Sequence, residues 1–470
     1  MQFLPELALL GAALVIFLVS LGKTDADKMK TVAICLGITV FAATLFSFGQ
    51  KGSLFYDAYK IDLYSQVFKT LIAGAMVVVL ILGRKLKDIQ KTVHPEYYLF
   101  LFISVLGLMM LVSSVELLSI FVAMELSSFA VYIMVPMRND IGNYHFQMEA
   151  GIKYLLFGVT ATGFMLFGMS YLFGLTGSTQ LAVIMEKLSH IYNQPAAIVA
   201  IMMVLAGFFY KLALFPFHFW VPDVYEGASN ETTAFIASVP KLAAVALLIR
   251  LVSMVNGEGQ IIVNILMVCA VLSMFYGNLS ALVQTDIKRM LGFSGIAHAG
   301  FVLLGILTFQ ISGYANALYY IIGYVVMNLA CFLVICSVSS NGENVQIKDL
   351  SGLHKRSPLL ALTLTVALFA LAGIPPFVGF MGKFMLLAGA LRQGYLLLVI
   401  LAAINTAIAI FYYLSVVRVT FCSDPDNKDS VVSGLFTNMT SIVLLLIIVI
   451  MGVAPQRFVD FATFTVQSMM

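Results

Sequence analysis

Apolar runs of about twenty residues follow one another along almost the whole chain, and they restrict its fold more than any other feature. A helix needs roughly 20 apolar residues to cross the hydrocarbon core of a bilayer. The 470 residues are 61% hydrophobic and only 10% charged, whereas soluble domains are about one quarter charged. The sequence therefore predicts an all-α integral membrane protein that lies in a lipid bilayer.

The apolar runs predict about fourteen transmembrane helices. The expected spans lie near residues 3–21, 31–49, 63–83, 97–114, 117–135, 151–174, 196–220, 229–251, 259–283, 291–311, 314–338, 358–391, 394–418 and 436–454. No basic region precedes the first run and no small-residue cleavage site follows it, so we expect a retained span and not a signal peptide.

Lysines and arginines in the connections predict the orientation of the chain. If the N-terminus lies outside, the inner connections carry most of these residues, as the positive-inside rule requires. We therefore expect a multi-pass protein with both termini outside, although an odd number of spans would overturn this. The expected units are residues 1–96 with three helices, 97–251 with a five-helix repeat, 259–421 with a second, inverted five-helix repeat, and 422–470 with the last helix.

Two expected spans are broken by proline, and each break has a lysine beside it. In span seven, LALFPFHFW, Lys211 precedes Pro216 by five residues. In span twelve, LALFALAGIPPFVGFMGKF, Lys383 follows Pro376 by seven residues. The two spans run in opposite directions, so the lysines occur in mirrored order. This pattern is typical of inverted repeats whose ion sites lie at discontinuous helices.

Glu125 lies at the centre of the fifth span, in FVAMELSSFAVYIMV. An acidic side chain inside a membrane segment is costly and is a functional candidate by default. The alternative is a fixed ion pair that locks two helices together. Glu116 lies nine residues earlier, on the opposite face of the helix, and we interpret it as a boundary residue.

Three buried lysines fit a proton relay. Lys211, Lys241 and Lys383 stand in apolar segments that also contain a proline, and Lys241 directly follows Pro240. If Glu125 and Lys211 form and break an ion pair, the lysine takes up and releases a proton. The alternative is a set of static lysines whose amines are satisfied by backbone carbonyls.

Other ionisable residues have more than one interpretation. Lys153 lies close to Glu149 and can either join the relay or snorkel to the membrane surface. Lys69 is interpreted as a snorkelling or packing lysine, paired on one helix face with Asp62, seven residues before it. His298 is a candidate proton carrier, because the pKa of imidazole lies near neutrality, but it can also be a hydrogen-bonded packing residue.

The sequence lacks the patterns of other functional classes. It has no dinucleotide-binding fingerprint, P-loop, iron–sulfur cysteine set or nucleic-acid motif. The five cysteines form no CxxC pair, and we interpret them as packing residues. His218 follows the break in span seven, where a cap or loop role is as plausible as proton exchange. We expect no cofactor or metal on this chain.

Three segments resemble the antiporter-like membrane subunits of respiratory complex I. They are FYKLALFPFHFWVPDVYEGAS, QTDIKRMLGFSGIAHAGFVLLG and LAGIPPFVGFMGKF, and they occur in the order of that family. Within the family, the form WVPDVYEGA is most similar to subunit N of bacterial NADH-quinone oxidoreductase.

The resemblance implies a bacterial inner-membrane protein with fourteen helices and two inverted five-helix repeats. It implies proton pumping coupled to quinone reduction elsewhere in the complex, with flavin, iron–sulfur clusters and quinone in partner subunits. Other membrane-arm subunits are the implied partners. The proton-carrying residues carried over from the family are Glu125, Lys153, Lys211, Lys241, His298 and Lys383.

Two other readings remain open from the sequence. The large subunits of multisubunit sodium/proton antiporters share the fold and the buried lysines, and would operate on ion gradients without an electron donor. A passive scaffold in the membrane arm would use the charged residues only for helix packing. A row of buried lysines near helix breaks argues against the scaffold, because packing does not need such costly groups.

Overall fold

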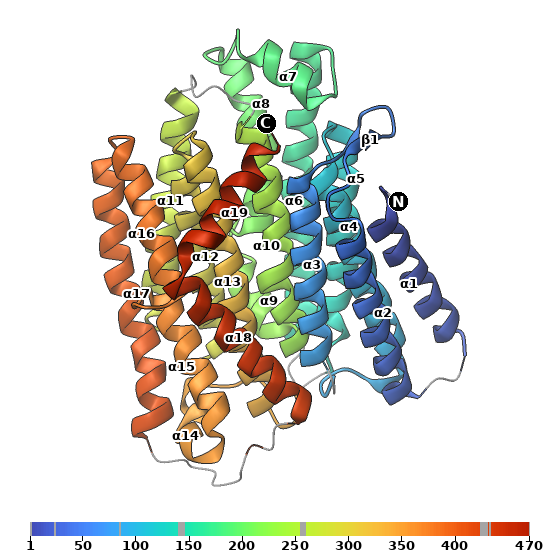
Figure 1. The fold of residues 1–470 in the computed structure, drawn as a ribbon, viewed down its shortest axis with the longest axis vertical. Helices are drawn as coiled ribbons and strands as arrows, with labels where there is room; N and C mark the ends of the chain where they lie inside the picture. The colour runs from blue at the N-terminus through green and yellow to red at the C-terminus, as the bar shows by residue number, and fades with distance from the viewer. Residues whose placement is uncertain are drawn as a thin grey trace.

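The structure is a bundle of long helices packed side by side (Figure 1). It is a computed structural model, and it describes residues 2–22, 25–83, 86–139, 146–253, 260–423, 431 and 434–469. Both termini lie toward the end of the bundle that carries strand β1 (Figure 1).

The N-terminal part contains three apolar helices and a short hairpin. Its elements are α1 (Leu4–Ser20), α2 (Ala26–Phe46), β1 (Gly52–Leu54), β2 (Tyr59–Ile61), α3 (Leu63–Leu82) and the 3₁₀ turn η1 (Lys91–Val93). The antiparallel hairpin was not expected from the sequence. Helix α3 begins where it does because the Asp62 carboxylate accepts a hydrogen bond from the Ser65 amide at 2.7 Å.

The middle of the chain surrounds one completely buried helix. Its elements are α4 (His94–Ser113), α5 (Leu117–Met134), η2 (Val135–Met137), α6 (Phe146–Thr176), α7 (Leu181–Leu188), α8 (Pro195–Leu212), α9 (Val221–Gly227) and α10 (Asn230–Ser253). Helix α10 packs against α3, α4, α8 and α13, which come from all three parts of the chain. It therefore forms the centre of the bundle, and a polar side chain on it is shielded from both lipid and water.

The last part of the chain has a second set of long helices. Its elements are α11 (Gln260–Ala281), α12 (Ile287–Ile306), α13 (Ile311–Val338), η3 (Ile347–Leu350), α14 (Leu353–Arg356), α15 (Pro358–Ala372), α16 (Val378–Arg392), α17 (Leu396–Cys422), α18 (Leu435–Val453) and α19 (Pro455–Gln467). Helices α12 and α13 are largely buried, whereas α17 and α18 have large apolar side chains on the outside.

Within the described residues, 12 helical segments are long and apolar enough to cross a membrane. Two shorter apolar helices, Leu4–Ser20 and Pro358–Ala372, accompany them. Large apolar side chains such as Leu10, Phe167 and Phe411 point outward from these helices, as they do toward lipid. The prediction of an all-α membrane protein is confirmed.

One predicted ion pair is wrong. Lys69 does not pair with Asp62, because both carboxylate oxygens of Asp62 accept hydrogen bonds from Arg250, at 2.9 and 3.1 Å. Lys69 instead pairs with Glu6 of α1 at 2.8 Å, and both side chains are fully buried. Buried charges need a partner, and these two pairs join α1 to α3 and α3 to α10.

Candidate functional site: buried lysines at two helix breaks

The predicted break in span seven separates α8 from α9. Helix α8 ends where Ala213 takes a left-handed conformation with φ of 62°. Beyond it, the Phe215 amide donates a hydrogen bond to Ser273 Oγ of α11 at 2.9 Å, and the Trp220 indole donates to the Tyr210 carbonyl. These two donors of the break are therefore satisfied by protein, one of them from the second half of the chain.

The predicted break in span twelve separates α15 from α16. Helix α15 ends at Gly373, whose φ of 87° suits a residue without a side chain. Lys383 of α16 reaches back across the break, and its amine donates hydrogen bonds to the carbonyls of Leu371 and Ala372 at 2.9 and 3.2 Å. These carbonyls are the negative end of the α15 dipole, which favours a positive charge on Lys383.

Lys211 lies in the last turn of α8 and faces α5. Its amine donates a hydrogen bond to Ser128 Oγ at 2.8 Å, and Ser127 Oγ lies 3.5 Å away. Glu125 accepts a hydrogen bond from Thr162 of α6 at 2.7 Å. Among the described residues no ion pair joins Glu125 to Lys211, so the structure shows the two groups apart, each held by neutral hydroxyls.

Glu116 is a boundary residue, as predicted. It is the N-cap of α5, and its carboxylate accepts a hydrogen bond from the Ser119 amide at 2.7 Å. Burial by itself raises the pKa of Glu116, but the hydrogen bonds that it accepts from Ser119 and its neighbours outweigh burial and lower it.

Tyr324 of α13 connects Lys241 to His298. The Lys241 amine donates a hydrogen bond to the Tyr324 hydroxyl at 3.1 Å, and the centroids of the Tyr324 and His298 rings lie 5.1 Å apart. His298 Nδ1 lies 2.6 Å from the Tyr320 hydroxyl and Nε2 lies 3.2 Å from the Tyr413 hydroxyl. Neutral imidazole donates from one nitrogen and accepts at the other, so both ring nitrogens of His298 have a tyrosine hydroxyl as partner.

Lys153 differs from the other candidates, because it is paired with acids. Its amine lies 2.6 Å from both Glu149 and Asp223. Asp223 of α9 also pairs with Arg289 of α12 at 3.0 Å, and Arg289 pairs with Glu226. This network joins α6, α9 and α12, and so connects the two halves of the bundle.

The network affects the ionisation of Asp223. Burial raises the pKa of Asp223, but the hydrogen bonds from Lys153 and Arg289 outweigh burial and hold the pKa below its usual range. Asp223 therefore stays ionised at neutral pH. Its ion pair with Arg289, which we call the Asp223–Arg289 clamp, therefore keeps α9 and α12 joined by opposite charges.

His218 lies in the break but outside this chain of contacts. It is fully buried, and neither ring nitrogen has a hydrogen-bond partner among the described residues. The ring packs against Phe215, Phe219 and Tyr276. A ring without a hydrogen-bond partner does not act as a cap, so this geometry supports a role that the sequence did not suggest, packing within the break.

The tyrosines are the site residues that sequence reasoning missed. Tyr320, Tyr324 and Tyr413 contact His298 or Lys241, yet the chain contains 20 tyrosines and their spacing does not distinguish these three. The signal was present only in the tertiary structure, because α12, α13 and α17 must pack together before the hydroxyls reach His298.

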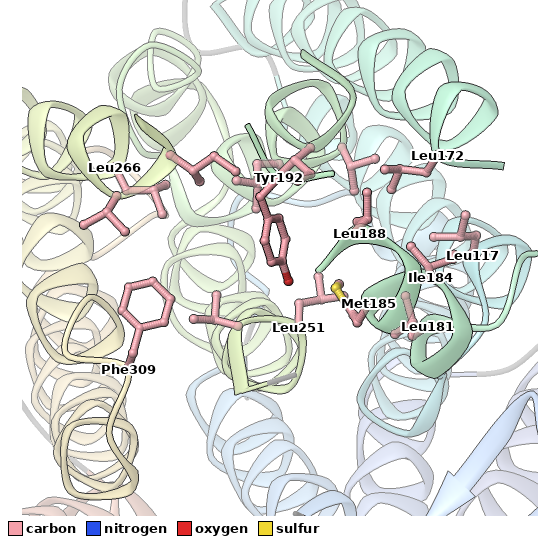
Figure 2. A pocket seen from close by; sticks show the side chains of 16 residues that line it. Leu117, Leu172, Leu181, Ile184, Met185, Leu188, Tyr192, Leu251, Leu266 and Phe309 are labelled. Atoms are coloured by element: carbon pink, nitrogen blue, oxygen red, sulfur yellow. The ribbon is translucent and has the colours of Figure 1, made fainter. Parts of the chain in front are cut away.

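An apolar cavity of about 90 Å³ lies apart from the charged side chains (Figure 2). Leucine, isoleucine, valine and methionine line it together with Tyr192 and Phe309, and no ionisable acid or base contributes.

Comparison with known proteins identifies the family. Residues 114–409 match the family described as NADH:quinone oxidoreductase/Mrp antiporter, TM. The chain is 50% identical over 464 residues to NADH-quinone oxidoreductase subunit N 2 of Opitutus terrae, covering 98% of this chain and 97% of that one. It is 44% identical over 461 residues to subunit N 2 of Solidesulfovibrio magneticus, again covering 98% and 97%.

Solved structures agree with this assignment. A chain of respiratory complex I from Thermus thermophilus with bound aureothin has a TM-score of 0.83 and 28% identity, covering 97% of this chain and 98% of that chain. A chain of the Mrp complex from Dietzia has a TM-score of 0.87 at 19% identity, covering 100% of this chain and 96% of that chain, and shows a shared fold. The chain therefore belongs to the NADH:quinone oxidoreductase/Mrp antiporter family, within it to subunit N of NADH-quinone oxidoreductase, a proton-translocating membrane subunit of complex I.

Proposed function

We propose that protons cross this subunit along a row of buried groups. In order, they are Glu125, Lys211, Lys241, His298 and Lys383. Lys153 connects this row to the Asp223–Arg289 clamp through its ion pair with Asp223. A change of charge in a neighbouring subunit closes or opens the Glu125–Lys211 ion pair. The proton then moves through Lys241 and His298 to Lys383, which releases it.

The observation that carries this proposal is the nature of the lysines' partners. Lys211 donates to serine hydroxyls, Lys241 to a tyrosine hydroxyl and Lys383 to backbone carbonyls. In contrast, Lys69 and Arg250, which are also fully buried, each pair with a carboxylate. A buried cation without a counter-ion is costly, so an amine with neutral partners can give up its proton more easily than one in an ion pair.

The same proposal includes an arrangement of the chain in the membrane. Fourteen spans result if α1 and the broken pairs α8–α9 and α15–α16 each count as one crossing. Helices α4 to α10 and α11 to α17 then form two inverted repeats, each with one broken helix beside a buried lysine. Both termini lie outside the bacterial inner membrane. Flavin, iron–sulfur clusters and quinone belong to partner subunits, because the sequence has no motif to hold them.

Proton counting in the assembled complex tests the proposed row. Lys211→Ala and Lys383→Ala are introduced into complex I, which is reconstituted in vesicles, and protons moved per NADH oxidised are measured. We expect both variants to assemble and reduce quinone with a lower proton yield. The control is Lys348→Met, which removes an exposed lysine. A wild-type proton yield in both alanine variants would refute the row.

A further inference from the structure

A second group of buried charges lies at the end of the bundle opposite the β1–β2 hairpin. Asp88 pairs with Arg138 at 3.0 Å, and the side chains are only 2% and 5% exposed. Arg138 also donates to the carbonyls of Glu226 and Gly342, both at 2.8 Å. The connections after α3, α5, α9 and α13 therefore meet around one guanidinium.

Lys288 and Glu231 complete this group. Lys288 at the start of α12 is fully buried, and its amine donates to the Ala228 carbonyl at 2.8 Å. Glu231 in the first turn of α10 is 6% exposed, and its Oε2 has no hydrogen-bond partner. Within the described part of the chain no cation lies within ion-pair distance of Glu231, although two basic residues belong to the same group.

An unpaired buried carboxyl needs an explanation. An ionised carboxylate in such surroundings is costly, whereas the protonated acid is far less so. The buried Asp88 nearby adds to this, since two carboxyl groups that share a site do not readily ionise together. Burial also raises the pKa of Asp88, against the opposing charges of Arg138 and Lys288. Asp88 has Arg138 as its counter-ion whereas Glu231 has no such partner among the described residues, so Glu231 is the acid of this group that can hold a proton.

The group adjoins a cavity at this end of the bundle. The cavity has a volume of about 260 Å³ and is lined by Arg138, Gln147, Glu226, Glu343 and their neighbours. That volume has room for several water molecules, and the half-exposed Glu343 lies on its wall. Arg138 lines this cavity and also pairs with Asp88, so the group of buried charges borders the cavity.

Helix α10 leads from Glu231 toward the row of lysines. Lys241 follows Glu231 by ten residues, which is about 15 Å along the helix. Ser238 lies between them, fully buried, with an Oγ that has no partner among the described residues. Asn328 of α13 also lies along this path, donating to the Ala237 carbonyl at 3.4 Å. Such hydroxyl and amide groups can hydrogen-bond to buried water, which would connect the two side chains.

We propose that the group of Asp88, Arg138, Glu231 and Lys288 is the site where this subunit takes up its proton, and that Glu231 receives it for delivery to Lys241. The inference rests on the proposed row of lysines and adds its starting point. In the proposed orientation the group faces the inner side of the membrane, from which protons are pumped. Arg138 and Lys288 act as positioning residues, since they hold the carbonyls and the Asp88 charge around Glu231.

The test compares three variants of complex I in vesicles. Glu231→Gln keeps the shape of the side chain and removes the titrating group. Lys241→Met interrupts the row itself. Asp27→Asn is the matched control, because Asp27 carries an acid whose side chain is 90% exposed, at the start of α2. Protons per NADH and quinone reduction are measured for each.

We expect Glu231→Gln to lower the proton yield as far as Lys241→Met, with quinone reduction retained and Asp27→Asn like the wild type. If Glu231→Gln pumps normally while Lys241→Met does not, the uptake site is wrong and the row stands. If Lys241→Met also pumps normally, the proposed row of proton carriers is refuted, and the uptake site that rests on it is refuted with it.

A second variant covers the case in which Glu231→Gln does not assemble. Glu231→Asp retains an acid on a side chain that is one methylene shorter. The titratable neighbours of this position are Asp88, Lys87, Lys288, Tyr97, Tyr98 and Cys336. Proton uptake should then show a shifted dependence on inner pH, which a purely structural role would not produce. An unchanged pH profile in this variant would overturn the proposal.

Discussion

The hydroxyl of Tyr324 accepts a hydrogen bond from the buried amine of Lys241, 83 residues away in sequence. The amine also lies 5.0 Å from the centroid of the same ring. Tyr324 thus gives Lys241 a neutral partner and connects it to His298, so the central lysine is held without a counter-ion.

Removing the Tyr324 hydroxyl should uncouple Lys241 from His298. Tyr324→Phe keeps the ring and its packing but leaves the amine without its hydroxyl partner, which costs about 1–3 kcal/mol at a buried site. We expect assembly and quinone reduction to remain and the proton yield to fall. Tyr276→Phe, on a partly exposed ring, is the control. Equal proton yields in the two variants would contradict the role of Tyr324.

Gly295 leaves the room that Lys241 occupies. A Cβ at this position would lie 2.8 Å from both Lys241 Nζ and the Tyr324 hydroxyl. Gly295→Ala should therefore displace the amine and cost about 1–3 kcal/mol through overpacking, with a reduced proton yield. Gly163→Ala on α6 is the matched control, since no atom lies within 4 Å of the added Cβ. Proton pumping in vesicles and thermal unfolding in detergent measure both effects.

Removing one partner of the buried Glu6–Lys69 pair should destabilise the subunit more than removing both. Lys69→Met leaves Glu6 buried without a cation and should destabilise the subunit by about 3–5 kcal/mol. The double variant Glu6→Gln with Lys69→Met should recover much of this loss, because no uncompensated charge remains. Thermal unfolding of the four proteins in a double-mutant cycle measures the coupling, and strict additivity would show that the pair does not interact.

The stability that the Asp223–Arg289 clamp gives the folded protein should depend on pH. Its pKa is lowered in the folded protein, so its contribution to stability is complete above the ordinary value of 3.8 and is lost as the pH falls through the lower folded-state value. Asp223→Asn should therefore be less stable than the wild type at neutral pH, and the difference should vanish in strong acid. Glu186→Gln, at an exposed acid, should show no such convergence. Unfolding midpoints across a pH series measure both.

The sequence determined the membrane helices, the two broken spans and the acidic and basic residues inside them. These features are local, because apolar length, a proline and a buried lysine can each be read from one short segment. For that reason α8–α9 and α15–α16 lie where the breaks were expected, and Glu116 lies at the boundary of α5 as predicted.

Only the tertiary structure decided which partner each charged side chain has. Lys69 pairs with Glu6 and not with Asp62, which is nearer in sequence. Lys241 donates a hydrogen bond to a tyrosine hydroxyl and not to a carboxylate. Each partner lies on another helix, and packing of the whole bundle sets which helix faces meet. A pattern within one helix gives the direction of its own side chains but carries no information on the neighbour that they reach.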